Sequence, residues 1–261
     1  MTQEMCIIAA VNDDQSLAQN LVASEMVRSG AVQVHAERGA KSASIAYNRG
    51  LDATDAPIVI FAHQDVYFPP GWETALSKVI EQVEAQDPNW GLIAPFGISE
   101  AAEHIGQVWS TSLGSVIGRD TQGPEKAQSY DELVIVMRRA SGLRFDDAMP
   151  QFHLYGTDIV QTAQQKGLGA YVCNLPVVHN DGFHDRLRSD FADAYHFLRK
   201  KWSTKLPLRT PVLWVTKSGW GLPIYRLKAW RSVNKRRSSA FDTATDPKVY
   251  SAKCGWEPAD T

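Results

Sequence analysis

The chain has 261 residues, of which 44% are hydrophobic and 21% are charged, as is typical of a globular protein with its own core. Its three cysteines, Cys6, Cys173 and Cys254, lie far apart without a C-x-x-C pair, which argues against a disulfide framework and a structural zinc site. The start of the sequence lacks a signal-peptide pattern, and no window approaches the ~20 apolar residues of a membrane span. We therefore expect a cytoplasmic protein.

The net charge of −2 conceals two segments of opposite charge. Residues 1–182 carry 11 Lys and Arg against 22 Asp and Glu, whereas residues 183–240 carry 14 against 3. A basic segment favours an anionic partner such as phosphate, nucleic acid or an acidic membrane surface. The same pattern is equally typical of a solvated helical face that balances an acidic body.

Short apolar runs alternate with amphipathic segments along the first 180 residues. We expect strands at residues 6–11, 31–37, 57–62, 90–97, 132–139 and 170–179. We expect helices at residues 13–30, 41–55, 72–86 and 157–167. Because the strand segments are continuously apolar, this order predicts an α/β fold with a mostly parallel sheet flanked by helices on both faces.

Two segments interrupt that alternation. Residues 97–123 are rich in Gly, Ser and Thr and are expected to form a loop. Beyond about residue 199 the sequence becomes basic, aromatic and proline-rich. We therefore expect one domain at residues 1–200 and a basic, aromatic C-terminal extension at residues 201–261.

The stretch APIVIFAHQDVYFPPGW, residues 56–72, joins an apolar strand to His63, Gln64 and Asp65 and then to a stiff turn. Ligands of open α/β sheets bind at the carboxyl ends of the strands. A carboxylate held there suits Mg²⁺ or Mn²⁺, and a nearby imidazole favours Mn²⁺ or a softer ion. Asp65 is thus either a metal ligand or a plain turn residue.

A second group of polar residues follows at the next helix and strand. Asp158, after Gly156 and Thr157, lies in the first turn of the expected helix, where it serves either as a favourable N-terminal charge or as a general base. His179 follows the apolar run LPVV. A lone histidine after a strand is usually structural, but two strand ends with matching chemistry favour a shared site.

These motifs resemble a known enzyme family. The segments YNRGLDATDAPIVIFAHQDVYFPPGW and FDDAMPQFHLYGTDIV…GAYVCNLPVVHN resemble the glycosyltransferase-like branch of the family 2 glycosyltransferases, over roughly residues 5–180. That family has the GT-A fold, a Rossmann-like nucleotide-diphospho-sugar transferase fold. The first segment is similar to its D-x-D metal motif in the form H-Q-D-V-Y, and the second to its acidic helix and metal-contacting histidine.

The resemblance implies roles for individual residues. Asp65, with His179 and His63, would bind Mn²⁺ or Mg²⁺ on the donor diphosphate, and Asp158 would be the catalytic base. Position 63 departs from the usual motif, which has aspartate there, and the histidine removes one negative charge. The implied nucleotide-binding residues are Asn12, Glu37, Tyr47, Asn48, Gln64 and Asp65.

Residues on the sugar side follow from weaker signals. Trp109, in the Gly-rich segment, either stacks on an acceptor sugar or fills the core. The resemblance also places Asp131 and Gly156 near the donor sugar or the acceptor.

The implied activity is metal-dependent transfer of a sugar, with inversion, from a nucleotide-sugar donor to a hydroxyl. A UDP-sugar is the default donor, and the acceptor is a glycan, a lipid-linked molecule or a protein. The basic C-terminal segment either makes peripheral contact with an anionic membrane, binds an acidic glycan, or packs on the acidic body.

Three alternatives have different requirements. A metallohydrolase would use His63, Asp65, His153 and His179, but the sequence lacks H-E-x-x-H spacing. A non-catalytic GT-A-like module would bind nucleotide or glycan and would have little need for a base. A nucleic-acid binder is disfavoured, because the acidic first two-thirds would repel phosphate backbones.

Overall fold

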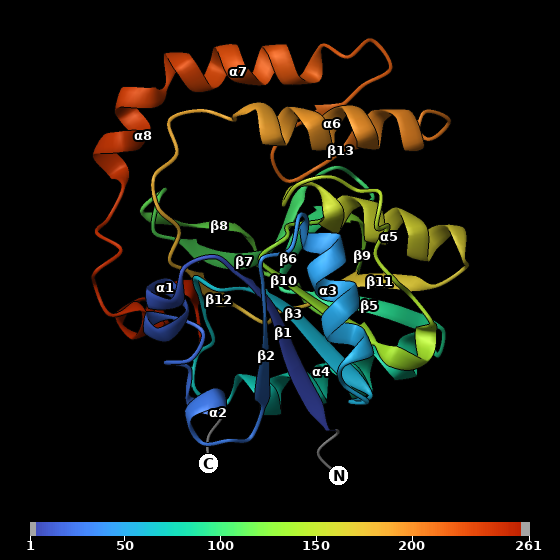
Figure 1. Cartoon of the computed structure of the whole chain (residues 1–261), viewed down its shortest axis with the longest axis vertical. Coiled ribbons are helices and arrows are strands. Elements are labelled where there is room, and N and C mark those ends of the chain that lie inside the picture. Colours follow the sequence, from blue (N-terminus) through green and yellow to red (C-terminus); the bar gives the residue numbers. More distant parts are fainter. Residues whose placement is uncertain (1–3, 257–261) are drawn as a thin grey trace.

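The computed structural model describes residues 4–256, which form a large curled sheet with helices on both faces (Figure 1). The main sheet has twelve strands, eleven of them in the order β2-β1-β3-β10-β5-β11-β9-β6-β7-β12-β4, while β8 pairs with β7. Its strands are β1 (Met5–Val11), β2 (Gln33–Arg38), β3 (Ile58–His63), β4 (Val66–Tyr67), β5 (Trp90–Ala94), β6 (Phe96–Ser99), β7 (His104–Ser110), β8 (Ser115–Arg119), β9 (Glu125–Tyr130), β10 (Val134–Arg138), β11 (Gly169–Val172) and β12 (Val177–His179). The α-helices are α1 (Asp14–Gln19), α2 (Glu25–Arg28), α3 (Ala43–Asp52), α4 (Trp72–Gln86), α5 (Tyr155–Gln165), α6 (Ser189–Lys201), α7 (Gly221–Arg231) and α8 (Val233–Ser239).

Most strands of this sheet point in one direction. The pairings β2-β1-β3 and β5-β11 are parallel, and following all the pairings through the sheet leaves only β7, β9, β10 and β12 reversed. The predicted α/β class with a mostly parallel sheet is therefore confirmed. The sheet is nevertheless mixed, because β10 runs antiparallel between β3 and β5.

The structure corrects four expected elements. The helix expected at residues 13–30 is two short helices, α1 and α2. In the turn between them, the Ser24 hydroxyl accepts a hydrogen bond from the backbone N–H of Phe68, which holds this turn against the segment after β4. The expected loop at residues 97–123 contains β7 and β8, an antiparallel pair that extends the sheet. The strands expected at 90–97 and 170–179 each divide in two.

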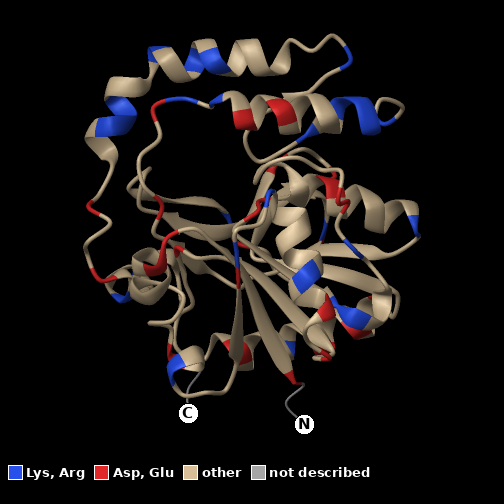
Figure 2. Cartoon of the chain, viewed as in Figure 1, with Lys and Arg blue, Asp and Glu red and all other residues tan. Residues whose placement is uncertain are grey.

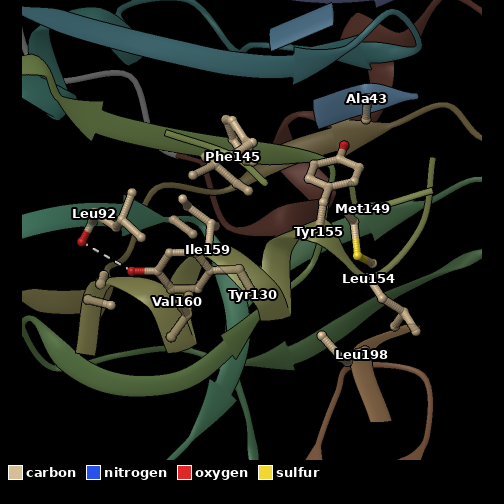
Figure 3. Close-up of a cluster of buried hydrophobic side chains, with 14 of the residues drawn as sticks. Ala43, Leu92, Tyr130, Phe145, Met149, Leu154, Tyr155, Ile159, Val160 and Leu198 are labelled. Carbon is tan, nitrogen blue, oxygen red and sulfur yellow. Dashed lines mark hydrogen bonds between the residues drawn. The ribbon is translucent and has the colours of Figure 1, made fainter. Parts of the chain in front are cut away.

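The hydrophobic core lies on both faces of the sheet. One cluster joins the sheet to α3, α5 and α6 through Tyr47, Ile159 and Tyr195, and part of it is drawn in Figure 3. The other joins the sheet to α1, α2 and α4. Each fully buried large apolar side chain contributes about 1.5–3 kcal/mol, so these faces fix the sheet and its strand ends.

The chain beyond α6 packs on the same core. A small hairpin, β13 (Leu208–Arg209) with β14 (Trp214–Val215), precedes α7, which lies alongside α6 above the sheet (Figure 1). Leu213, Val215 and Leu222 join the cluster that contains α6. The division at residue 200 stays a prediction. Within residues 4–256, no helix has the length and hydropathy needed to cross a bilayer.

Candidate functional site

The sheet brings together three of the predicted metal ligands. His63 is the last residue of β3, and Asp65 lies in the turn between β3 and β4. β4 pairs antiparallel with β12, and this places Val66 opposite His179. The backbone N–H of Asn180 donates to the carbonyl of Asp65 at 2.9 Å, which fixes the turn against the end of β12.

The ligand atoms of this triad face one another. Asp65 Oδ1 lies 3.4 Å from His179 Nε2 and 3.9 Å from His63 Nδ1, and all three ligand atoms lie within 4.8 Å of one another. Asp65 Oδ1 is buried and has no hydrogen-bond partner among residues 4–256. Such an orphaned carboxylate oxygen beside two imidazole nitrogens fits a divalent cation, with a donor set that suits Mn²⁺.

Tyr155 orients the His63 ring through Nε2, the ring nitrogen that faces away from Asp65. The Tyr155 hydroxyl donates to the carbonyl of Glu132 at 3.0 Å and therefore accepts from His63 Nε2, 2.8 Å away. This assigns the proton to Nε2 and leaves the lone pair of Nδ1 facing Asp65, as a metal ligand requires. Tyr47 completes the chain, because its hydroxyl lies 3.2 Å from that of Tyr155.

The charge of Asp65 is coupled to its two imidazole neighbours. Burial alone would raise the pKa of Asp65, but His179 and His63 hold it well below its ordinary value. Burial alone would lower the pKa of His179, but Asp65 and Asp181 raise it to about 10. Burial lowers the pKa of His63, so its ring is neutral. A proton on His179 thus balances the carboxylates, and a cation that binds there displaces it.

His179 also lines a cavity of about 640 Å³. Asp131 and Asp181 contribute carboxylates to the same wall, and Arg209 and Arg236 contribute positive charge. Asp181 accepts hydrogen bonds from the Ser110 hydroxyl at 3.0 Å and from the backbone N–H of Ser112 at 3.1 Å. The cavity therefore offers both anion-binding and proton-accepting groups next to the triad.

Asp158 lies elsewhere, at the contact of α5 with the end of α6. It is 2% exposed, and its carboxylate accepts hydrogen bonds from Lys201 Nζ at 2.8 Å and Trp202 Nε1 at 2.7 Å. Burial raises the pKa of Asp158, although Lys201 and Trp202 partly oppose the rise. Asp158 is not among the residues that line the cavity at His179, whereas Asp131 is.

Two of the predicted nucleotide residues meet at the ends of β1 and β3. Gln64 Nε2 donates to Asn12 Oδ1 at 2.6 Å, and Gln64 Oε1 accepts the backbone N–H groups of Asn12 and Asp13. Glu37, near the end of β2, pairs with His35 at 2.7 Å. These side chains line up along neighbouring strand ends, where a nucleotide is expected.

Tyr47 and Asn48 are buried in α3. Asn48 donates to the carbonyl of Phe145 at 2.9 Å and to Asp147 Oδ1 at 2.8 Å, and Tyr47 packs on Phe61. Both side chains therefore have hydrogen-bond or packing partners inside the protein, and their predicted contact with nucleotide stays a prediction.

Trp109 and Gly156 also have internal contacts. Trp109 is 4% exposed and stacks on Tyr250, with ring centroids 4.7 Å apart. A Cβ at Gly156 would lie 2.8 Å from the carbonyl of Tyr130, so only glycine lets α5 approach β9 this closely. His153 pairs with Asp190 at 3.5 Å and is not part of the triad.

Sequence reasoning missed three contributors to the site. Tyr155 lies in the quoted segment FHLYGTD, but nothing in its spacing shows that its hydroxyl reaches His63. Asp181 follows His179 by two residues, and that proximity was a usable signal. Arg236 comes from α8, far away in the sequence, and reaches the cavity only through the fold.

Residues 6–176 match the family model described as "Glycosyltransferase like family". The chain belongs to this family. A curated protein, "ATP synthase subunits region ORF 6" of Fuscovulum blasticum, is 29% identical over 147 residues, which cover 52% of this chain and 59% of that protein. The chain thus spans less than two-thirds of the length of this relative.

Two solved structures are similar at low identity. One is the mannosyltransferase PcManGT from Pyrobaculum calidifontis in complex with GDP-Man and Mn²⁺, with a TM-score of 0.48, 11% identity, and coverage of 97% of this chain and 76% of that chain. The other is GalNAc-T7 with UDP, GalNAc and Mn²⁺, with a TM-score of 0.48, 9% identity, and coverage of 97% and 58%. At these scores, the chemistry of the site rests on this chain's own residues and its family.

Proposed function

We propose that this protein is a metal-dependent glycosyltransferase that moves a sugar from a nucleotide-sugar donor to a hydroxyl acceptor. The observation that carries the proposal is the triad of His63, Asp65 and His179 beside a cavity, in a chain of the glycosyltransferase-like family. The orphaned Oδ1 of Asp65 has the charge and the position that a cation would satisfy.

The donor would lie across the strand ends. Asn12 and Gln64, already joined to each other, and Glu37 on the neighbouring strand would contact the base and ribose. Asp65, His63 and His179 would hold Mn²⁺ or Mg²⁺, which when bound neutralises the charge that develops on the leaving diphosphate. A UDP-sugar is the first donor to test.

The transfer would proceed by direct displacement with inversion, which needs one carboxylate to take the proton of the acceptor hydroxyl. The family resemblance favours Asp158 for this role, but its carboxylate is held by Lys201 and Trp202. For Asp158 to act, this pair must release it. Asp131 lines the cavity beside His179 and is the second candidate, favoured by its position.

The two alternative functions remain testable against this proposal. A non-catalytic module would use the same triad to bind a nucleotide without transferring the sugar. A metallohydrolase is less well supported, because His153 pairs with Asp190 and is not part of the triad.

The test incubates the protein with a panel of UDP-sugars and glycan acceptors, with Mn²⁺, with Mg²⁺ and with chelator. We expect metal-dependent release of nucleoside diphosphate coupled to a product with inverted anomeric configuration, measured by NMR. His179→Ala should abolish release, whereas His153→Ala is the matched control and should retain it. Metal-dependent nucleotide binding without transfer would assign the protein to the binding module. Hydrolysis of a phosphoester by the unmodified protein, lost in both His179→Ala and His153→Ala, would favour the hydrolase.

A further inference from the structure

The outer face of α7 exposes large apolar side chains that no described segment covers. Trp220, at the start of α7, is 65% exposed and Trp230 is 71% exposed, and between them Ile224 and Leu227 are 49% and 48% exposed. The spacing 220, 224, 227 and 230 places all four on one side of a helix that advances by about 100° per residue. We call these four residues the outer face.

The inner face of the same helix already has its partners. Leu222 and Ala229 are buried and Tyr225 is half-buried, and these three point about 170° away from the centre of the outer face. The helix is therefore anchored to the protein by one side, and the apolar outer face is not required for that anchoring.

Basic side chains surround the outer face. Arg226 and Lys228 flank it on opposite sides, Arg231 follows Trp230, and α8 adds Lys235 and Arg237, all of them exposed. The sequence contains no acidic residue from position 194 to position 241. Figure 2 shows basic segments along α7 and α8, with acidic segments on α6 beneath α7 and elsewhere lower in the molecule.

We propose that α7 and α8 dock this protein on the surface of an anionic lipid bilayer. An interfacial helix needs aromatic and aliphatic residues on one side, Lys and Arg at their margins, and no long apolar span, and α7 meets all three conditions. Exposed tryptophans suit the headgroup region, where an indole keeps one apolar and one polar end satisfied. The basic margin complements anionic lipid headgroups.

A second copy of this chain fits the outer face less well. A twofold contact through α7 would oppose the basic margins of the two copies, because the contact repeats the same patch on both sides. Among residues 4–256, Asp185 is the one acidic side chain that lines the same cavity as Arg226, Trp230 and Arg237, so most of those charges would have no partner and would repel.

Docking through α7 would place a second cavity beside the bilayer. A cavity of about 870 Å³, lined by Trp214, Trp220 and Ile224, opens at α7 and shares Tyr225 and Arg236 with the cavity at His179. An amphiphile with its chain in this apolar cavity could place a hydroxyl of its headgroup near the triad. This consequence, a membrane-borne acceptor, rests on the proposed function, whereas the docking itself does not.

The test is flotation of the purified chain with vesicles, without metal or nucleotide, so that it can fail or succeed independently of transfer. Vesicles of phosphatidylcholine alone are compared with vesicles containing about 30% phosphatidylglycerol, at about 0.1 M and about 0.5 M salt. We expect binding to the anionic vesicles that weakens at high salt. Failure of the folded protein to float with anionic vesicles overturns the proposal.

Variants separate the apolar face from the charge. Trp220→Ala with Trp230→Ala should weaken vesicle binding at least tenfold, and Arg226→Gln and Lys228→Gln should each weaken it about fivefold. The control pairs an exposed aromatic and a lysine outside this surface, Phe152→Ala with Lys78→Gln, and should bind as the unmodified protein does.

Circular dichroism and thermal unfolding check that each variant is folded. If the tryptophan variant binds vesicles unchanged, the outer face does not dock on lipid. A dimer of the unmodified protein in sedimentation, lost in the tryptophan variant while vesicle binding is absent, would assign the face to a second copy and likewise overturn the proposal.

Discussion

Removing the Tyr155 hydroxyl should weaken metal binding without touching a ligand. In Tyr155→Phe, His63 Nε2 loses its acceptor at 2.8 Å, and the hydroxyl no longer assigns the proton to the nitrogen that faces away from Asp65. Partners that orient metal-binding histidines are worth about 10–100-fold in affinity, or about 1.4–2.8 kcal/mol. We therefore expect the Kd for Mn²⁺ to rise by that factor.

The same substitution has a separate cost in stability. Tyr155 is 1% exposed, and its loss leaves His63 and Tyr47 without a hydrogen-bond acceptor in the core, which should lower the free energy of unfolding by about 1–3 kcal/mol. The matched control is Tyr171→Phe, which removes a buried tyrosine's hydrogen bond to Asp87 and should lower stability without changing metal affinity.

Isothermal titration calorimetry with Mn²⁺ measures the affinity, and nitrogen chemical shifts of His63 report the protonated ring atom. An unchanged Kd in Tyr155→Phe, with the Nε2 proton still in place, would refute the role assigned to Tyr155. An equal loss of affinity in Tyr171→Phe would show that the effect is only destabilisation.

Other predictions follow from the carboxylates. Asp131→Asn should retain nucleotide binding and lower kcat about 100-fold or more if Asp131 is the base. Asp158→Asn should retain nucleotide binding and abolish transfer if Asp158 is the base, so steady-state kinetics of the two variants decide between them. Burial raises the pKa of Glu132 well above its ordinary value, so the folded state keeps a proton that the unfolded chain releases above about pH 4.5. Unfolding in urea should therefore show the unmodified protein losing stability relative to Glu132→Gln as the pH rises above about 4.5, with a slope of at most about 1.4 kcal/mol per pH unit. A pH-independent difference would contradict a neutral Glu132.

The triad could be predicted from sequence because it depends on short-range signals. An apolar run ending in His63-Gln64-Asp65, and another ending in His179, indicate two strand ends with matching chemistry. The structure does not bring them together as parallel neighbours, because β12 runs in the opposite direction to β3. The pairing of β4 with β12 confirms that the two segments meet. The α/β class followed from the same apolar runs.

Other features depend on contacts between distant segments, which a single sequence does not show. The end of α6 places Lys201 and Trp202 on Asp158, and the C-terminal segment places Tyr250 on Trp109. All three partners lie more than 40 residues from the side chain that they contact. The strands β7 and β8 were missed because their many small and polar residues look like a loop when their sheet partners are unknown.

The most direct test of the central claim is calorimetric titration of UDP, GDP, CMP and dTDP into the protein, with and without Mn²⁺, for the unmodified chain and for Asp65→Ala. We predict that one nucleotide binds at least tenfold more tightly with Mn²⁺, and that Asp65→Ala loses this enhancement while remaining folded. If no nucleotide shows metal-dependent binding, or if Asp65→Ala keeps the enhancement, the triad is not a donor site, and the chain shares the fold of its family without this activity.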